Sequence, residues 1–281
     1  MASNNEIKAR QAAQWDNVAE SWRRRDAELE AKSRPINDWL CEKAGLAPGI
    51  RVLDLASGSG QPALAIANLV GHDGWVVATD IAPRMVEVLA DKAREAGLNN
   101  VEARVMDMES LDFPDASFDA VTCRWGFMYA PDPARSLAEV RRVLKDGGRL
   151  TMAVWDTPEK NPWNSLIVQA INQVQGPPPA DPDAPGPFRL ATPDRVQALL
   201  MDAGFRSVEL ETVSFEQRFP RAEDWWDYQL YVGGPLRTRM SSLSEEDQAR
   251  VKQIAISAAE EVNQGSDIRL GASCICAVAT K

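Results

Sequence analysis

A short stretch near residue 55 combines the residue types that bind a nucleotide-like ligand. An apolar segment, Val52–Leu55, runs into the small residues Ala56–Gly60, and a helical pattern follows. Glycine lets the backbone approach a ligand and adopt positive φ, and the start of a helix presents free N–H groups. Asp80 stands close to the end of the next apolar segment. A carboxylate there can accept both hydroxyl groups of a ribose. The pattern predicts a site for a ribose-containing cofactor.

The glycine loop by itself does not identify that cofactor. Gly58, Gly60 and Ala63 also satisfy the loose G-x-G-x-x-G/A fingerprint of dinucleotide-binding proteins. An NAD-dependent oxidoreductase, a non-catalytic nucleotide-binding protein and a plain strand-to-helix turn are therefore alternatives. The oxidoreductase alternative would require a proton donor of the Tyr/Lys type. The sequence shows none, because no tyrosine has a lysine four positions on: Tyr129, Tyr228 and Tyr231.

The elements that must position these residues alternate between strand and helix patterns. Strands are predicted at Arg51–Leu55, Trp75–Thr79, Val101–Met106, Phe118–Cys123 and Arg149–Trp155. Helices are predicted at Pro62–Val70, Pro83–Ala96 and Pro133–Leu144. Strands separated by helices imply a parallel sheet that is covered on both faces. Ligands of such sheets bind beyond the carboxyl ends of the strands, where the glycine loop lies.

The flanking segments depart from this alternation. Helices are predicted at Glu6–Leu29 and Arg34–Lys43 before the core, and at Asn161–Gln175, from Pro193, at Arg221–Tyr231 and at Ser244–Asn263 after it. Strands are predicted at Val208–Phe215 and Gly271–Thr280, and a proline-rich loop at Gly176–Pro187. We expect three regions: N-terminal helices over the cofactor (1–45), a cofactor-binding core (46–156), and an acceptor cap with C-terminal strands that complete the sheet (157–281).

Four segments, taken together and in order, identify a family. Val52–Gly60, Met106–Met108, Phe113–Val121 and Glu139–Leu150 resemble successive motifs of the class I S-adenosylmethionine-dependent methyltransferases. The resemblance extends over about Trp15 to Trp155 and is greatest to the small-molecule branch that includes the ubiquinone and menaquinone C-methyltransferases. It implies a Rossmann-like, doubly wound, mostly parallel seven-stranded α/β sheet with helices on both faces, N-terminal helices and a helical cap. It also implies S-adenosylmethionine as cofactor and S-adenosylhomocysteine as product.

The same resemblance assigns cofactor contacts to the loop, to the strand ends and to the N-terminal helix. Asp80 would bind the ribose hydroxyls, and Asp107 would accept from the adenine amine. The full set is Trp15, Trp22, Ala56, Ser57, Gly58, Gly60, Pro62, Asp80, Ile81, Met85, Asp107, Met108, Cys123 and Arg124. Two alternatives stay open for the indoles of Trp15 and Trp22: shielding the sulfonium by cation–π attraction, or packing their helix onto the core. Ala56 stands where the family often has glycine.

The acceptor side is less defined. Trp125–Tyr129 follows the fourth strand and should border the acceptor, with Trp125 and Tyr129 as candidate catalytic residues, and Trp225, Trp226 and Tyr228 are candidates to line the cap. The single histidine, His72, precedes the second strand and should lie in a surface turn at the opposite edge of the sheet. A base must then be a carboxylate, Tyr129 or the substrate itself. We expect C- or O-methylation of a small apolar or aromatic acceptor.

Composition excludes several other classes. The net charge of −10 disfavours nucleic acid and anionic lipid, and no apolar run approaches the roughly 20 residues of a membrane span. The four cysteines show no disulfide or metal spacing, and Cys274 and Cys276 should pack in the core. We therefore expect no metal, a cytoplasmic location and a small-molecule partner, with monomer and homodimer both open.

Overall fold

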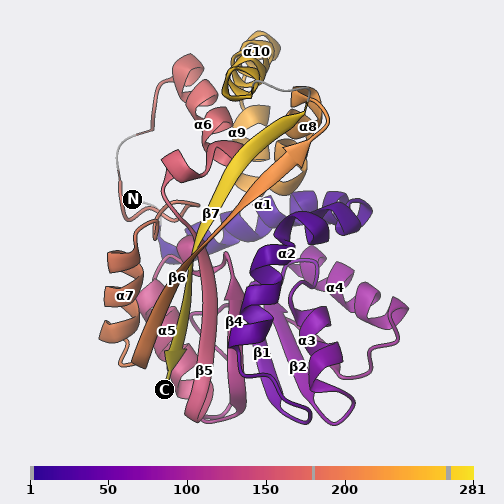
Figure 1. Ribbon diagram of the computed structural model, residues 1–281, viewed down its shortest axis with the longest axis vertical. Helices are drawn as coiled ribbons and strands as arrows, with labels where there is room; N and C mark the ends of the chain where they lie inside the picture. The colour runs from indigo at the N-terminus through magenta and orange to yellow at the C-terminus, as the bar shows by residue number, and fades with distance from the viewer. Residues whose placement is uncertain (1–2, 179–180, 264–266) are drawn as a thin grey trace.

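The apolar segments pair into one sheet in the computed structural model, which describes residues 3–178, 181–263 and 267–281. The seven strands follow the order β3-β2-β1-β4-β5-β7-β6 (Figure 1). Their bounds are β1 Arg51–Leu55, β2 Trp75–Asp80, β3 Val101–Val105, β4 Phe118–Arg124, β5 Leu144–Trp155, β6 Arg206–Phe219 and β7 Ile268–Thr280. The pairs from β3 to β5 are parallel, and β7 runs antiparallel to both β5 and β6. The predicted fold class is confirmed.

Helices cover the sheet and extend beyond it. Figure 1 places α2 and α3 in front of the strands and α5 and α7 at the other side. The α-helices are α1 Asn4–Arg24, α2 Asp26–Lys43, α3 Ala63–Val70, α4 Pro83–Glu95, α5 Pro133–Val143, α6 Pro162–Gln175, α7 Pro193–Asp202, α8 Ala222–Val232, α9 Gly234–Ser241 and α10 Glu245–Val262. Two short 3₁₀ turns, η1 Phe127–Tyr129 and η2 Pro158–Lys160, follow β4 and β5.

Local chemistry explains several helix starts. Thr192 caps α7 by accepting from the Arg195 N–H at 3.4 Å, and Ser244 caps α10 by accepting from Asp247 at 3.1 Å. The first residue of α4 is Pro83, whose fixed φ suits that position and whose missing N–H leaves no intrahelical bond unmade.

The structure corrects four element predictions. The break between the first two helices falls at Arg25, and α2 continues through Pro35 because the proline removes only one helical hydrogen bond. α9 was not predicted, since Gly234 and Pro235 resemble a turn signal. β5 begins at Leu144 with a register shift opposite Phe118, and β6 is longer than predicted.

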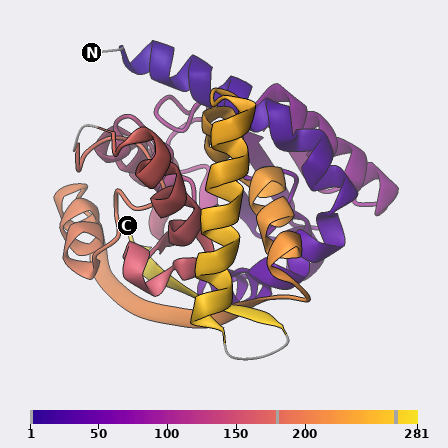
Figure 2. The same ribbon diagram turned by 90° about the horizontal axis from the view of Figure 1, so that it is seen from above.

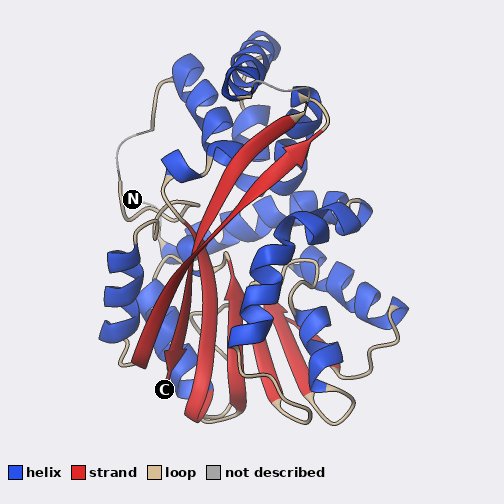
Figure 3. Cartoon of the chain, viewed as in Figure 1, coloured by secondary structure: helices blue, strands red, loops and turns tan. Residues whose placement is uncertain are grey.

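A helical cap stands over one end of the sheet (Figures 1 and 3). β7 pairs with β5 only over Cys274–Thr280, while its first residues, from Ile268, pair with β6 alone. This antiparallel ribbon therefore extends beyond the parallel strands. The cap helices are α6, α8, α9 and α10, and in the view from above α10 crosses the middle of the cap (Figure 2). α1 runs between the cap and the sheet, in contact with α4, α8 and α9.

Two further sequence predictions concern membrane-spanning helices and the proline-rich loop. No helix in the described ranges is long and apolar enough to cross a membrane. The predicted proline-rich loop, Gly176–Pro187, has no helix or strand where it is described, and its residues 179–180 lie outside the described residues.

Candidate functional site

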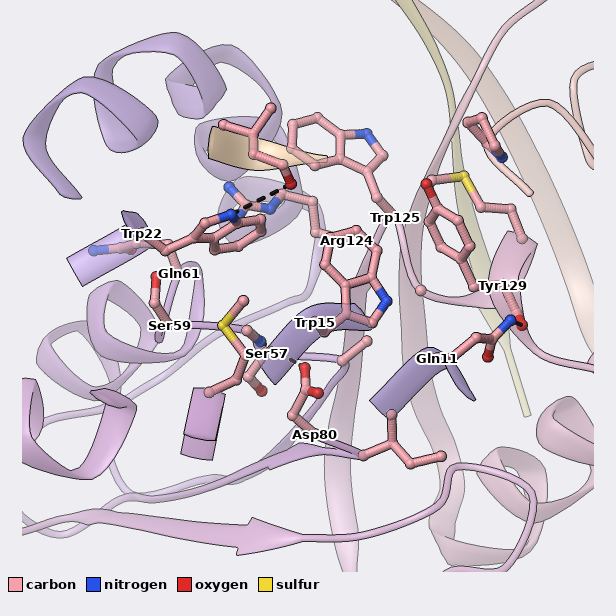
Figure 4. Close-up of a pocket in the computed structure, with 18 of the residues that line it drawn as sticks. Gln11, Trp15, Trp22, Ser57, Ser59, Gln61, Asp80, Arg124, Trp125 and Tyr129 are labelled. Carbon is pink, nitrogen blue, oxygen red and sulfur yellow. Dashed lines mark hydrogen bonds between the residues drawn. The ribbon is translucent and has the colours of Figure 1, made fainter. Parts of the chain in front are cut away.

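The site is a cavity between the carboxyl ends of the parallel strands, α1 and the cap (Figure 4). The residues after β1, the last residue of β2 and the last residue of β4 all border it: Ala56, Asp80 and Arg124. Parallel strands place their carboxyl ends at one edge of the sheet, so residues distant in sequence meet there. The cavity continues into the cap, where it is bordered by side chains of α2, α6, β6 and α8.

Asp80 joins the glycine loop to the start of α4. Its Oδ2 accepts from the Gly58 N–H and its Oδ1 accepts from the Ala82 N–H, both at 2.9 Å. Burial raises the pKa of Asp80, while these backbone hydrogen bonds act in the opposite direction. Each carboxylate oxygen can accept a further hydrogen bond. The carboxylate is therefore fixed in orientation and able to receive two hydroxyl groups.

Two residues of the glycine loop, Ala56 and Gly58, adopt left-handed backbone conformations. Gly58 has φ 51° and Ala56 has φ 52°. A Cβ on Gly58 would lie 2.9 Å from the Trp22 ring, so only glycine fits beneath this indole. At Ala56 the conformation costs a non-glycine residue about 1–2 kcal/mol.

A second acid, Asp54, lies fully buried beneath the loop. Its Oδ1 accepts from the Thr122 hydroxyl at 2.5 Å, and its Oδ2 has no hydrogen-bond donor within the described chain. Burial raises the pKa of Asp54 to about 6, against the lowering effects of the Thr122 hydrogen bond and of the nearby Arg124 charge. The charge of Asp54 beneath the loop thus changes around pH 6.

The predicted adenine end contains an ion-paired cluster. Lys8 of α1 lies 2.7 Å from Asp107 Oδ2 and 2.5 Å from Glu109 Oε2. Burial lowers the pKa of Lys8, but the hydrogen bonds to both acids outweigh it and raise that pKa overall. Asp107 Oδ1 accepts from the Glu109 N–H at 2.9 Å. The cluster fixes the Asp107 carboxylate and attaches the start of α1 to the loop after β3.

Three aromatic side chains cover the middle of the cavity (Figure 4). The Trp15 ring meets Trp22 edge-on with centroids 6.0 Å apart and Tyr129 edge-on at 5.4 Å. The Trp22 Nε1–H donates to the Val232 carbonyl of the cap, and burial raises the pKa of Tyr129. Tyr129 is therefore protonated at neutral pH. All three rings line the cavity, and the face of an aromatic ring can attract a cation.

Arg124 and Trp125 form the next part of the cavity wall. The Arg124 Nη1 donates to Asn37 Oδ1 at 2.7 Å, and its guanidinium lies 4.7 Å from the Trp125 ring centroid. Burial lowers the pKa of Arg124 to about 10, so it stays charged at neutral pH. Trp125 has φ 58°, a strained value for a bulky residue. Its ring stacks on Trp155 at 4.3 Å.

The cap end holds polar residues that sequence reasoning missed. Lys32 of α2 donates to the Arg218 carbonyl at 2.7 Å and lies 3.6 Å over the Phe219 ring. Burial lowers the pKa of Lys32 to about 8. Gln217 and Asn164 also line this end. No motif marks these residues, because they stand in different elements and meet only when the cap folds over the sheet.

Most of the predicted cofactor residues line the cavity. Those that do are Trp15, Trp22, Ala56, Ser57, Gly58, Asp80, Ile81, Met85, Asp107, Met108 and Arg124, together with the catalytic candidates Trp125 and Tyr129. Gly60, Pro62 and Cys123 do not. Gly60 is buried against Leu64 and Leu89, and Pro62 precedes α3 beneath the loop. Cys123 points to the opposite side of β4 from Arg124 and is fully buried.

Other side chains singled out from the sequence have structural positions. Trp225 is fully buried and donates to the Trp163 carbonyl at 2.7 Å, so it packs the cap, whereas Tyr228 lines the cavity. The His72 side chain is 92% exposed, which places it in a surface turn. Cys274 and Cys276 are buried and unpaired in disulfides. In the described part of the chain, no three His, Cys, Asp or Glu side chains gather in a metal-binding arrangement.

Comparison with known proteins agrees with this geometry. Residues 52–148 match a family model described as a methyltransferase domain. The ubiquinone/menaquinone biosynthesis C-methyltransferase UbiE of Teredinibacter turnerae is 41% identical over 132 residues, which are 47% of this chain and 51% of that relative. The chain therefore spans about half the length of the curated relative it matches.

Solved structures extend the similarity to the fold. A Bacillus halodurans protein, whose assignment as a methyltransferase is provisional, shares 26% identity at a TM-score of 0.59, covering 87% of this chain and 98% of that one. The YcgJ protein of Bacillus subtilis shares 23% identity at a TM-score of 0.59, covering 87% and 97%. Residues 52–148 are therefore similar in sequence to methyltransferase domains, and the chain shares the fold of these solved structures.

Proposed function

We propose that the whole chain is an S-adenosylmethionine-dependent methyltransferase that methylates carbon or oxygen of a small acceptor with an apolar or aromatic body. The observation that carries the proposal is the placement of Asp80. Its two oxygens bind the Gly58 and Ala82 N–H groups and border a cavity shared with Asp107 and with the aromatic cover. The similarity to UbiE, named as a C-methyltransferase of quinone biosynthesis, supports a quinone-like acceptor.

The chain's own residues fit the cofactor. Asp80 would hold the ribose hydroxyls, Asp107 the adenine amine, and Arg124 the carboxylate of the methionyl part. S-adenosylmethionine, when bound, supplies a methyl group already activated by its sulfonium. Trp15 and Trp22 exclude water from that region, and Tyr129 presents a ring face. The protein's main contribution is then to align donor and acceptor, which can contribute on the order of 7–11 kcal/mol in favourable cases.

Proton removal is the second requirement for some acceptors. Tyr129 and Tyr228 are not available as bases at neutral pH, because burial raises the pKa of each hydroxyl and keeps it protonated. Lys32 lines the acceptor end, and its pKa near 8 leaves a neutral fraction at mildly alkaline pH. An acceptor that is already nucleophilic, such as an activated aromatic carbon, needs no base from the protein.

The test is calorimetric titration with S-adenosylhomocysteine. Wild-type protein should bind, and Asp80→Ala should weaken binding by about 1–3 kcal/mol, because it removes a buried acceptor of hydrogen bonds. Asp146→Ala, which removes an exposed acid in the turn of β5, is the matched control and should bind as wild type does. Absence of binding by the wild type would overturn the proposal, and NAD would be the next ligand to titrate.

A further inference from the structure

Two residues that line the cap end of the cavity carry buried amide oxygens for which the described residues supply no hydrogen-bond donor. Gln217 of β6 is 3% exposed. Its Nε2 donates to the Lys32 carbonyl at 3.5 Å, and its Oε1 has no hydrogen-bond donor in the described chain. An amide oxygen buried without a donor destabilises the protein that contains it. Because Gln217 lines the cavity, a ligand that supplies the missing donor would explain this oxygen.

Asn164 repeats the arrangement on α6. Its Nδ2 donates to Gln229 Oε1 at 3.5 Å, and its Oδ1 is buried without a donor among the described residues. The partner is itself fixed, since the Gln229 Nε2 donates to the Trp163 carbonyl at 2.7 Å. The Asn164 amide is therefore oriented by a short chain of hydrogen bonds.

The surroundings of these two amides are aromatic. Trp125 stacks on Trp155, whose ring centroid lies 4.8 Å from that of Trp163. All three indoles border the same cavity as Gln217 and Asn164. Indole faces accommodate a planar apolar body, while the two carbonyl oxygens accept hydrogen bonds only. A ligand with a planar apolar ring and hydrogen-bond donors at one end would fit both the indole faces and the two amide oxygens.

We propose that Gln217 and Asn164 are specificity-determining residues, which select acceptors that carry hydrogen-bond donors, hydroxyl or amino groups, on an apolar ring. This inference rests on the proposed function. An ether in place of the hydroxyl removes the donor and leaves the amide oxygens unpaired after desolvation, so it is discriminated against more strongly than a mere change of size would be.

The experiment compares matched probes by ligand-observed NMR titration of protein saturated with S-adenosylhomocysteine. The pairs are 2-naphthol with 2-methoxynaphthalene, and 4-phenylphenol with its methyl ether. Wild type should bind each hydroxyl member at least about 5-fold more tightly than its ether. Gln217→Met and Asn164→Leu should each reduce that preference, and the double variant should reduce it below about 2-fold. Gln169→Met, an exposed substitution on α6, should retain it.

Two further measurements make each outcome decisive. Without ligand, Gln217→Met removes the unpaired oxygen together with the long Nε2 hydrogen bond to the Lys32 carbonyl, and these two effects on stability oppose each other. We expect Tm to fall by no more than about 3 °C, and a larger fall would show that the protein itself pairs this oxygen. A wild type that binds no hydroxyl member better than its ether, or a preference that survives both substitutions, would also overturn the inference. Loss of S-adenosylhomocysteine binding by the wild type would instead overturn the proposed function, and the probes would then be titrated on the ligand-free protein.

Discussion

Asp54 is a buried acid whose raised pKa makes the stability of the fold depend on pH. It sits within β1, where neighbouring residues are apolar, and its only side-chain hydrogen bond in the described chain comes from Thr122. Burial raises its pKa to about 6 from an ordinary value of 3.8. In the folded protein the carboxyl therefore binds a proton at a higher pH than it does in the unfolded chain. This group's contribution to stability increases as pH falls from above 6 towards 4.

A comparison of wild type with Asp54→Asn isolates this effect. The difference in unfolding free energy, wild type minus variant, should increase by about 1 kcal/mol between pH 7 and pH 5. The measurement is urea denaturation at both pH values. Acids whose pKa is lowered in the fold, such as Glu139, contribute less to stability as pH falls. Their contributions are the same in wild type and variant, so they cancel in the difference. Parallel pH dependences for the two proteins would contradict the prediction.

At the scale of elements, α1 is the helix that joins the two ends of the site. Lys8 pairs with Asp107 and Glu109 at one end. In the middle, the Asp16 carboxylate accepts from the Arg84 N–H at 2.8 Å, which caps α4 from outside that helix. Towards the other end, Arg23 lies 2.8 Å from Asp91. These contacts hold Trp15 and Trp22 over the glycine loop.

Lys8→Met should release the start of α1. The Glu109 side chain is only 3% exposed, so removing its partner leaves a buried charge uncompensated. We expect the free energy of unfolding to fall by about 1–3 kcal/mol, and S-adenosylhomocysteine to dissociate faster in stopped-flow measurements. Lys43→Met is the control, because Lys43 makes one surface ion pair at 3.8 Å. Equal effects of the two substitutions would contradict a role for Lys8 in holding the helix.

For the whole molecule, the fold predicts where stability is concentrated. Strands β1, β2, β4 and β5 lie inside the sheet with few exposed residues, whereas α1 and the cap pack against its end. Hydrogen exchange should accordingly be slowest in the central strands and faster in α1 and the cap. Ligand binding stabilises the folded state by mass action, by about 2.7 kcal/mol at 100 times Kd.

S-adenosylhomocysteine should change exchange in a defined pattern. We expect slower exchange in Asn4–Arg24 and in the glycine loop at 56–60, because both border the predicted cofactor region. α10 should change little, since none of its residues lines the cavity. Exchange measured by mass spectrometry checks both. Protection confined to the cap helices would place the ligand elsewhere and would contradict the assigned site.

Prediction from sequence succeeded where structure depends on neighbours in the chain. The core strands and helices matched to within a few residues, because apolar periodicity, caps and glycines are local signals. It failed at Arg25, where the chain breaks the first helix without a glycine or proline, and at α9, where Gly234 and Pro235 begin a helix. In the fold, α1, α8 and α9 pack against one another, and such contacts between distant segments leave no local signal in the sequence.

The sequence by itself determined the position of the proposed cofactor site. The glycine loop, Asp80 and Asp107 each follow or end a strand, and a parallel sheet necessarily brings such positions to one edge. Only the tertiary structure decided which residues form the proposed acceptor site. Lys32 and Gln217 are 185 positions apart and belong to a helix and a strand that no local signal pairs. Their meeting depends on how the cap packs over the sheet, which is a property of the folded core as a whole.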